Sequence, residues 1–130
     1  MAKPKPSAGE LEILRVLWRR GPSTVHQVQP ELKRGDQVGY TTVLKLLQIM
    51  FEKGLVKRDE STRPHVFRAA VAEAQVKRRL VADLLDDVFE GSSMSLVMQA
   101  LSAKPASADE VRQLRELLDE IEGEIEGGRS

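Results

Sequence analysis

Residues 36–69 constrain the fold of this chain more than any other segment, because a helical periodicity is followed directly by two strand-like runs. Between residues 40 and 53, apolar side chains recur at three- and four-residue steps and form one stripe. Glycines at positions 39 and 54 mark the two ends of this predicted helix. Its opposite face is short, polar and rich in hydrogen-bond donors, and it consists of Thr41, Lys45, Gln48 and Glu52.

Two short strands are predicted immediately after the helix. Residues 55–58 and 65–68 have the composition of strands and enclose a polar tip at residues 59–64. A helix followed by a two-stranded hairpin is the core of a winged helix-turn-helix. The polar face of the helix is arranged as a nucleic-acid reader requires, so this segment is the predicted DNA-reading unit.

Two further helices are predicted upstream, in the order that a winged helix requires. Ser7 and Glu10 have the spacing of a capping box, and the first helix should run from there to about Gly21. Ser23 is expected to cap the second helix, and Pro30 should shorten or kink it.

Charge is distributed unevenly although the formal net charge is zero. Residues 1–70 hold 13 Lys and Arg against 7 Asp and Glu, a net charge of +6. Residues 71–130 hold 7 against 13, a net charge of −6. A basic segment with a helix-turn-helix pattern suits a polyanion, because neutralised phosphates supply most of the non-specific affinity of such proteins. The acidic, leucine-rich half instead favours contact with protein.

The second half predicts three more amphipathic helices, at residues 73–89, at residues 93–103, and from a second capping box at Ser107 onward. These helices have little else to cover their apolar stripes, so we expect them to pair with a second copy of the chain. The residues predicted to lie in the dimer interface are Leu80, Leu84, Val88, Leu96, Val97, Leu101, Leu114, Leu117, Leu118 and Ile121.

The predicted fold is therefore mainly α with a small β-hairpin: a winged helix-turn-helix domain plus a C-terminal helical dimerisation arm. The predicted segments are a disordered basic arm (1–6), the winged-helix DNA-binding domain (7–70), the helical dimerisation domain (71–126) and a flexible tail (127–130).

Several classes of protein are not expected. The chain has no cysteine, which excludes disulfides and thiolate metal sites and makes a reducing cytoplasm the simplest location. It has no apolar run of membrane-spanning length and no signal-peptide pattern. We find no nucleophile motif, glycine-rich phosphate loop or metal-ligand spacing, and His26 and His65 read as surface histidines. We therefore expect neither an enzyme nor a bound metal or cofactor.

Three motifs together resemble the penicillinase-repressor family of bacterial regulators, also called the BlaI/MecI/CopY family. They are SAGELEILRVLW at residues 7–18, YTTVLK at residues 40–45 and EKGLV at residues 52–56. The resemblance covers about residues 7–122. It implies a homodimeric winged-helix repressor that occludes promoters by binding a pseudo-palindromic operator through the helix at residues 40–53. It also implies release by proteolysis that a membrane sensor protease triggers.

The chain departs from the family at some positions. Many members have proline where this chain has Tyr40, and arginine where it has Leu44 and Ile49. We expect a different operator, because two lost guanidinium groups change which bases or phosphates can be read. The pair Gln99-Ala100 aligns with an Asn-Phe bond that is cleaved in some members, and the cysteine cluster of the copper-responsive branch is absent.

Double-stranded operator DNA is the expected partner, besides the second copy of the chain and the sensor protease. The resemblance places Thr41 and Thr42 at positions that the family uses at base edges and phosphates. The full set of expected DNA contacts is Tyr40, Thr41, Thr42, Lys45, Gln48, Lys57, Arg58 and Arg63. Two alternatives stay open: a winged helix that binds protein with an incidental basic surface, and a regulator whose small effector enters the dimer arm.

Overall fold

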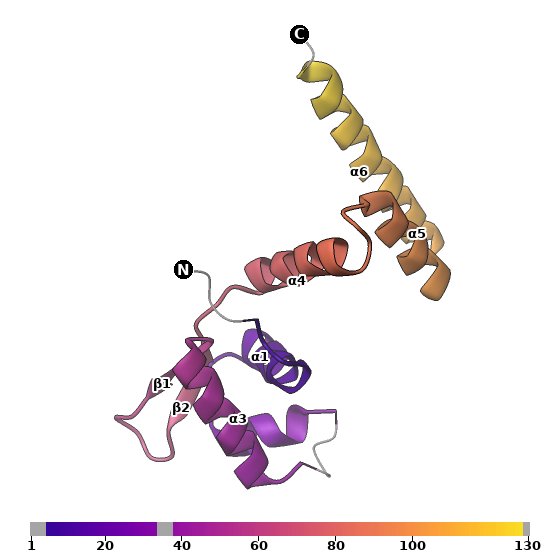
Figure 1. The fold of residues 1–130 in the computed structure, drawn as a ribbon. Helices are drawn as coiled ribbons and strands as arrows, with labels where there is room; N and C mark the ends of the chain where they lie inside the picture. Colours follow the sequence, from indigo (N-terminus) through magenta and orange to yellow (C-terminus); the bar gives the residue numbers. More distant parts are fainter. Residues whose placement is uncertain (1–4, 34–37, 129–130) are drawn as a thin grey trace. The chain divides into compact units, whose positions relative to one another are not determined.

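The computed structural model describes residues 5–33 and 38–128. Its elements are α1 (Ala8–Arg20), α2 (Val25–Val28), the 3₁₀ turn η1 (Gln29–Glu31), α3 (Tyr40–Lys53), β1 (Val56–Asp59), β2 (Val66–Ala69), α4 (Glu73–Asp87), α5 (Ser93–Ala103) and α6 (Ala108–Gly127) (Figure 1). The predicted fold class, mainly α with one small hairpin, is confirmed. None of the described helices is both long and apolar enough to cross a lipid bilayer.

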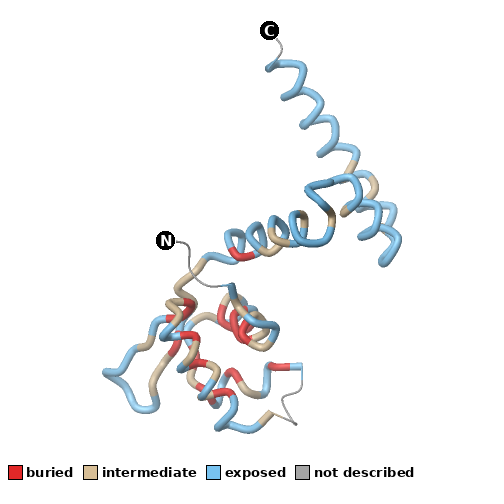
Figure 2. Tube along the Cα trace, viewed as in Figure 1, coloured by how far each residue is buried: buried red, intermediate tan, exposed pale blue. Residues whose placement is uncertain are grey.

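The chain forms two compact units, Met1–Ala82 and Asp83–Ser130. Residues 1–4 and 129–130, which hold most of the predicted basic arm and part of the predicted tail, lie outside the described residues, as do residues 34–37 before α3. The buried positions lie in the first unit, whereas no described side chain from residue 83 to residue 128 is buried (Figure 2). The first unit therefore has its own core, and the second does not.

The core of the first unit joins the first three helices to the hairpin. α1 and α3 contribute just over half of it, and side chains from α2, β1, β2 and the adjoining residues Leu32 and Leu55 complete it. The buried apolar residues of this cluster are Ile13, Leu14, Val16, Leu17, Val25, Val28, Leu32, Val43, Leu47, Met50, Leu55, Val56 and Phe67. Trp18 lies at its edge, and its indole N–H donates to the carbonyl oxygen of Val71 at 2.9 Å, which ties α1 to the segment before α4.

The capping box predicted at the start of α1 is confirmed. Ser7 Oγ accepts from the backbone N–H of Glu10 at 3.2 Å, and Glu10 Oε1 accepts from the backbone N–H of Ser7 at 2.8 Å. The Glu10 side chain is only 2% exposed, and its Oε1 and Oε2 also accept from Lys53 Nζ at 2.8 and 3.1 Å. A buried ion pair therefore joins the first turn of α1 to the last turn of α3.

The surroundings of Glu10 act on its pKa in opposite directions. Burial by itself raises the pKa, but the hydrogen bond and charge of Lys53 and the hydrogen bonds of Ser7 lower it, and the net pKa lies below its ordinary value of 4.5. A carboxyl with a lowered folded-state pKa stabilises the fold above its unfolded-state pKa. That contribution is lost as the pH falls through the folded-state value.

The second helix corrects one sequence-based expectation. Thr24, not Ser23, caps α2, and its side chain accepts from the backbone N–H of Gln27. Ser23 is instead buried and forms an antiparallel bridge with Phe67, with N–H···O distances of 2.9 and 2.8 Å. The backbone of Ser23 pairs with the hairpin, and Thr24, the next residue, therefore caps α2. As predicted, the helix is short, and Pro30 lies in the 3₁₀ turn that ends it.

The strands form one residue later than predicted, at Val56–Asp59 and Val66–Ala69. The shift at β1 has a local cause, because the backbone N–H of Leu55 donates to the carbonyl oxygen of Met50 at 2.9 Å and closes α3.

α4 ends at Asp87 rather than at Phe89 as predicted. The backbone turns there, since Glu90 and Gly91 both adopt positive φ, 51° and 81°.

In the second unit, the predicted bounds of α5 are confirmed. Both α5 and α6 have a side-chain cap at the N-terminal end. Ser92 Oγ accepts from the backbone N–H of Ser95, and Ser107 forms the predicted capping box with Glu110. These helices are well terminated although little is packed against them.

We predict that Lys53→Met lowers the free energy of unfolding by about 2 kcal/mol at neutral pH, because Glu10 would keep a buried charge without its partner. The value is below that of a fully buried pair because Lys53 keeps a third of its side chain exposed. The variant should also lose less stability than wild type as the pH falls below about 4.5. Urea denaturation between pH 7 and pH 3 measures both effects.

Lys77→Met is the matched control, since Lys77 pairs with Glu73 on the exposed surface of α4. It should change stability by less than about 0.5 kcal/mol. Equal losses in the two lysine variants would contradict the importance assigned to the buried pair.

Candidate nucleic-acid interface

The ends of α3 are set by its own sequence. At the C-terminal end, Gly54 adopts the left-handed conformation with φ 82° and donates to the carbonyl oxygen of Phe51, while Leu55 donates to that of Met50. These two bonds form a Schellman motif, which glycine favours because it has no Cβ to clash. At the N-terminal end, Gly39 is the N-cap and supplies no side-chain hydrogen bond. The predicted bounds of this helix are confirmed.

The two faces of α3 have opposite environments. Val43, Leu47 and Met50 are fully buried in the core. Leu44 and Ile49, which stand where relatives were expected to carry arginine, are half-buried at the edges of the helix. The side chains predicted to contact DNA lie on the exposed side, and they are Tyr40, Thr41, Thr42, Lys45 and Gln48. The helix thus presents a compact polar face on a rigid support.

Tyr40 has a neighbour that sequence reasoning missed. Its ring lies against the imidazole of His26, with centroids 4.7 Å apart and planes inclined by 39°. Tyr40 nevertheless stays 38% exposed. The residues are 14 positions apart, and no periodicity within either helix could have indicated this contact.

The hairpin beside α3 is fixed to the helical core. β1 and β2 pair antiparallel, with Lys57 opposite Arg68 and Arg58 opposite Phe67, and the bridge between Ser23 and Phe67 extends the pairing on the other side of β2. Lys57 and Arg68 are both exposed on the outer face. Like charges directly opposite each other weaken a hairpin. The bridge between Ser23 and Phe67 therefore compensates for the unfavourable pair of Lys57 and Arg68.

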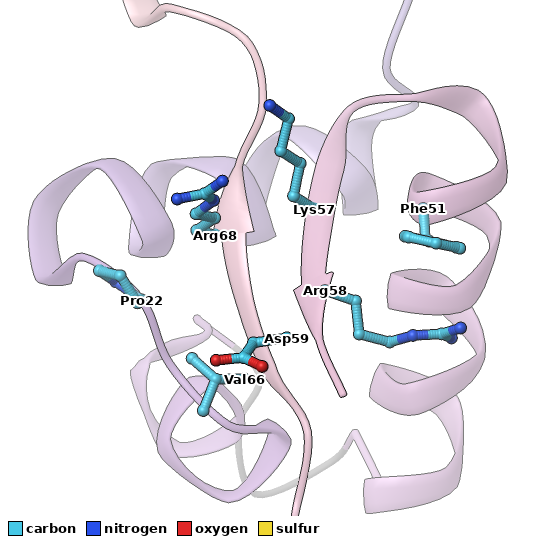
Figure 3. Close-up of a pocket in the computed structure, with 7 residues that line it drawn as sticks. All are labelled: Pro22, Phe51, Lys57, Arg58, Asp59, Val66 and Arg68. Atoms are coloured by element: carbon cyan, nitrogen blue, oxygen red, sulfur yellow. The ribbon is translucent and has the colours of Figure 1, made fainter. Parts of the chain in front are cut away.

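The strand and tip cations do not have the same environment. Arg58 extends from β1 toward α3, where its guanidinium carbon lies 4.2 Å from the centroid of the Phe51 ring and its NH2 pairs with Glu60 (Figure 3). Lys57 and Arg63 are exposed, Arg63 at the tip. Both can reach a partner outside the chain, whereas Arg58 is engaged within it.

A shallow hollow lies over this part of the hairpin. It has a volume of about 560 Å³ and is lined by Pro22, Phe51, Lys57, Arg58, Asp59, Val66 and Arg68 (Figure 3). Hydrogen bonds from Ser61, together with the charges of Arg68 and His65, outweigh desolvation and hold the pKa of Asp59 below its ordinary value. Arg58 is already paired with Glu60, but Lys57 and Arg68 against the single carboxylate of Asp59 still leave this surface more suitable for an anion than for an apolar ligand.

Metal binding has no visible basis in the part of the chain that the structure describes. No group of three or more His, Asp or Glu side chains gathers there as a metal site would require. His26 is exposed and His65 is half-buried, on different elements.

We predict that Arg58→Ala lowers the free energy of unfolding by about 1 kcal/mol, because it removes the cation–π contact and uncovers Phe51. Arg63→Ala, an equal change of charge at the exposed tip, should stay within about 0.5 kcal/mol of wild type. Thermal and urea denaturation of the two variants in parallel provide the comparison. Identical stabilities would show that Arg58 is not held by its neighbours.

Comparison with known proteins places the chain in a family. Residues 6–120 match the family described as penicillinase repressor. The methicillin resistance regulatory protein MecI of Staphylococcus aureus is 21% identical over 113 residues, which cover 87% of this chain and 92% of the relative. The transcriptional regulator BlaI of Mycobacterium tuberculosis is 30% identical over 117 residues, which cover 88% of this chain and 84% of the relative.

A solved structure agrees at the level of the fold. The transcriptional regulator Tm0710 of Thermotoga maritima superimposes with a TM-score of 0.51 at 14% identity, and the match covers 95% of this chain and 79% of that one. The family match extends over both the winged helix and most of the helical arm. The chain therefore belongs to the penicillinase-repressor family of winged-helix, DNA-binding transcriptional repressors.

Proposed function

We propose that the protein represses transcription as a homodimer, by binding a pseudo-palindromic operator that overlaps a promoter. In this proposal α3 enters the major groove of each half-site and the hairpin contacts the phosphate backbone. A repressor of this kind performs no chemical step, which agrees with the expectation that the chain is not an enzyme.

The division of α3 into a buried and a polar face is the observation that carries the proposal. The major groove of B-form DNA admits one α-helix, and side chains that reach base edges must be polar and project from a well-supported helix. Lys45 and Gln48 lie one turn apart on the exposed face, and Thr41 and Thr42 lie at its N-terminal end. Lysine can donate to guanine and glutamine can pair with adenine, so the face carries chemistry for reading bases.

Charge supports contact with the phosphates. The exposed cations Lys57, Arg63 and Arg68 lie on the hairpin beside α3, in the half of the chain with a net charge of +6. Backbone N–H groups at the start of α3 add partial positive charge where Tyr40 and the threonines are exposed. Phosphate contacts would fix the register of the protein while α3 reads the sequence.

The composition of the second unit supports the dimer. Apolar residues on α6 alternate at steps of three and four, as in the core positions of a coiled coil, and they are Val111, Leu114, Leu118, Ile121 and Ile125. Leu118 is 61% exposed within a single chain. A second copy would cover this stripe symmetrically and bring two winged helices to one operator.

We also propose that proteolysis linked to a membrane sensor protease ends repression. The proposal rests on the membership of the family and on the exposure of α5 to solvent, and not on the pair Gln99-Ala100, which differs from the Asn-Phe bond that is cleaved in some members. A cut in this arm would remove α6 and with it the proposed dimer contact.

The DNA-reading role of α3 can be tested with Lys45→Ala. A duplex is first selected from a random-sequence pool by the wild-type protein, and binding is then measured by fluorescence anisotropy. We expect about tenfold weaker binding, because a lysine contact to a base edge is lost. Lys104→Ala removes the same charge between α5 and α6 and should bind like wild type.

The salt dependence of DNA affinity distinguishes this function from that of a winged helix that binds protein. If six or more phosphates are neutralised, wild-type affinity should fall at least about a thousandfold between about 50 and 200 mM salt. Affinity that does not respond to salt would refute phosphate-driven binding.

The dimer can be tested with Leu118→Asp, which places a charge in the apolar stripe of α6. Sedimentation should detect a monomer, and affinity for the selected duplex should fall by about a hundredfold or more, because each monomer engages only one half-site. Gln113→Asp introduces the same charge on the same helix, off the stripe, and should stay dimeric. Full affinity in a monomeric Leu118→Asp protein would remove the need for a dimer.

A further inference from the structure

We infer that His26 and Gln29 act as positioning residues that hold the first turn of α3 in the orientation that reads DNA. We call these two side chains the brace. The inference rests on the proposed function and adds to it a pair of residues outside the expected DNA contacts.

Gln29 supplies the first contact of the brace. Its Nε2 donates to the backbone carbonyl oxygen of Val38 at 2.8 Å, in a partly buried position. Val38 lies one residue before Gly39, the N-cap of α3. The hydrogen bond therefore ties η1 directly to the point at which α3 begins.

His26 supplies the second contact. Its ring lies 4.7 Å from that of Tyr40, within the range of aromatic pairs, and Tyr40 is the first residue of α3. Both side chains are exposed, so the contact is not a by-product of core packing. Val25 and Val28 bury the other side of α2 in the core, which gives the brace a rigid base.

The first turn of α3 needs such support because other restraints are weak there. Val38 packs against the core before the helix begins, but within α3 the core contacts start only at Val43, and residues 40–42 are exposed. Ser or Thr side chains cap α1, α2, α5 and α6, whereas Gly39 offers no side-chain cap to α3. Helix ends without caps fray, and a frayed reading end must be ordered at a cost when DNA binds.

The brace therefore preorganises the first turn of α3 for DNA binding. It restrains Tyr40 and the following two threonines before the operator arrives, so that less conformational entropy is lost on binding. Its contribution should be larger for the operator than for unrelated DNA, because non-specific binding rests mainly on charge, most of which lies on the hairpin cations, whereas reading of bases needs the first turn of α3 in place.

The test compares full-length variants on two duplexes of about 30 base pairs, long enough for two half-sites. One is selected from a random-sequence pool by the wild-type protein, and the other has an unrelated sequence. His26→Ala and Gln29→Met each remove one contact of the brace, and His26→Phe keeps an aromatic ring. Gln75→Met, at an exposed glutamine of α4, is the matched control. Hydrogen exchange is followed in the free proteins at the amides of residues 43–46, because these N–H groups donate to carbonyl oxygens of residues 39–42 and lose protection when the first turn frays.

His26→Ala and Gln29→Met should bind the selected duplex about 3- to 10-fold more weakly, the loss expected for one aromatic or hydrogen-bonded contact. Affinity for the unrelated duplex should stay within about twofold of wild type. Amide exchange at the start of α3 should accelerate, His26→Phe should restore both properties, and the control should resemble wild type. In a Tyr40→Ala background, His26→Ala should have no further effect, since His26 acts through Tyr40.

Three outcomes would overturn the inference alone: unchanged affinity of both brace variants, equal losses on the two duplexes, or an undiminished effect of His26→Ala without Tyr40. A wild-type protein that retains no duplex from the pool would instead overturn the proposed function, and the inference with it.

Discussion

The ion pair between the buried carboxylate of Glu10 and Lys53 fixes the C-terminal end of α3 against the start of α1. A charge with 2% exposure needs a partner, and Lys53 on the last turn of α3 provides it at 2.8 Å. The same carboxylate closes the capping box of α1, so one group joins α1 to α3 through a contact between residues 43 positions apart. The core fixes the middle of α3 through Val43 and Leu47. The helix is thus held from its C-terminal end by charge and along its length by packing.

The hairpin depends on a different constraint. Two strands of four residues are marginal by themselves, and the facing cations Lys57 and Arg68 weaken them further. The backbone bridge between Ser23 and Phe67, together with the burial of Phe67, attaches β2 to the helical core. Support from the core therefore permits a concentration of positive charge that an isolated hairpin would not tolerate. The basic surface beside α3 is a consequence of this attachment.

Features that are set by residues three or four positions apart are predictable from the sequence. The bounds of α3 and the capping boxes at Ser7 and Ser107 are of this kind. Features that depend on contacts between residues distant in sequence are not. Ser23 and Thr24 are both suitable caps, and only the pairing with Phe67, 44 residues away, selects between them. Likewise, no local pattern indicates that Arg58 stacks on Phe51 instead of facing solvent.

The two units have different sources of stability, and this difference bears on how repression could end. The buried core lies within the first unit, while the described helices of the second contain no buried side chain. In the proposed mechanism, association with a second copy supplies the missing burial. Loss of the arm would then leave each winged helix folded, because neither the Glu10 pair nor the core uses residues beyond Ala82. Such a fragment would still recognise a half-site but would lose the gain in affinity from a second one. Repression could therefore end without unfolding of the domain that reads DNA.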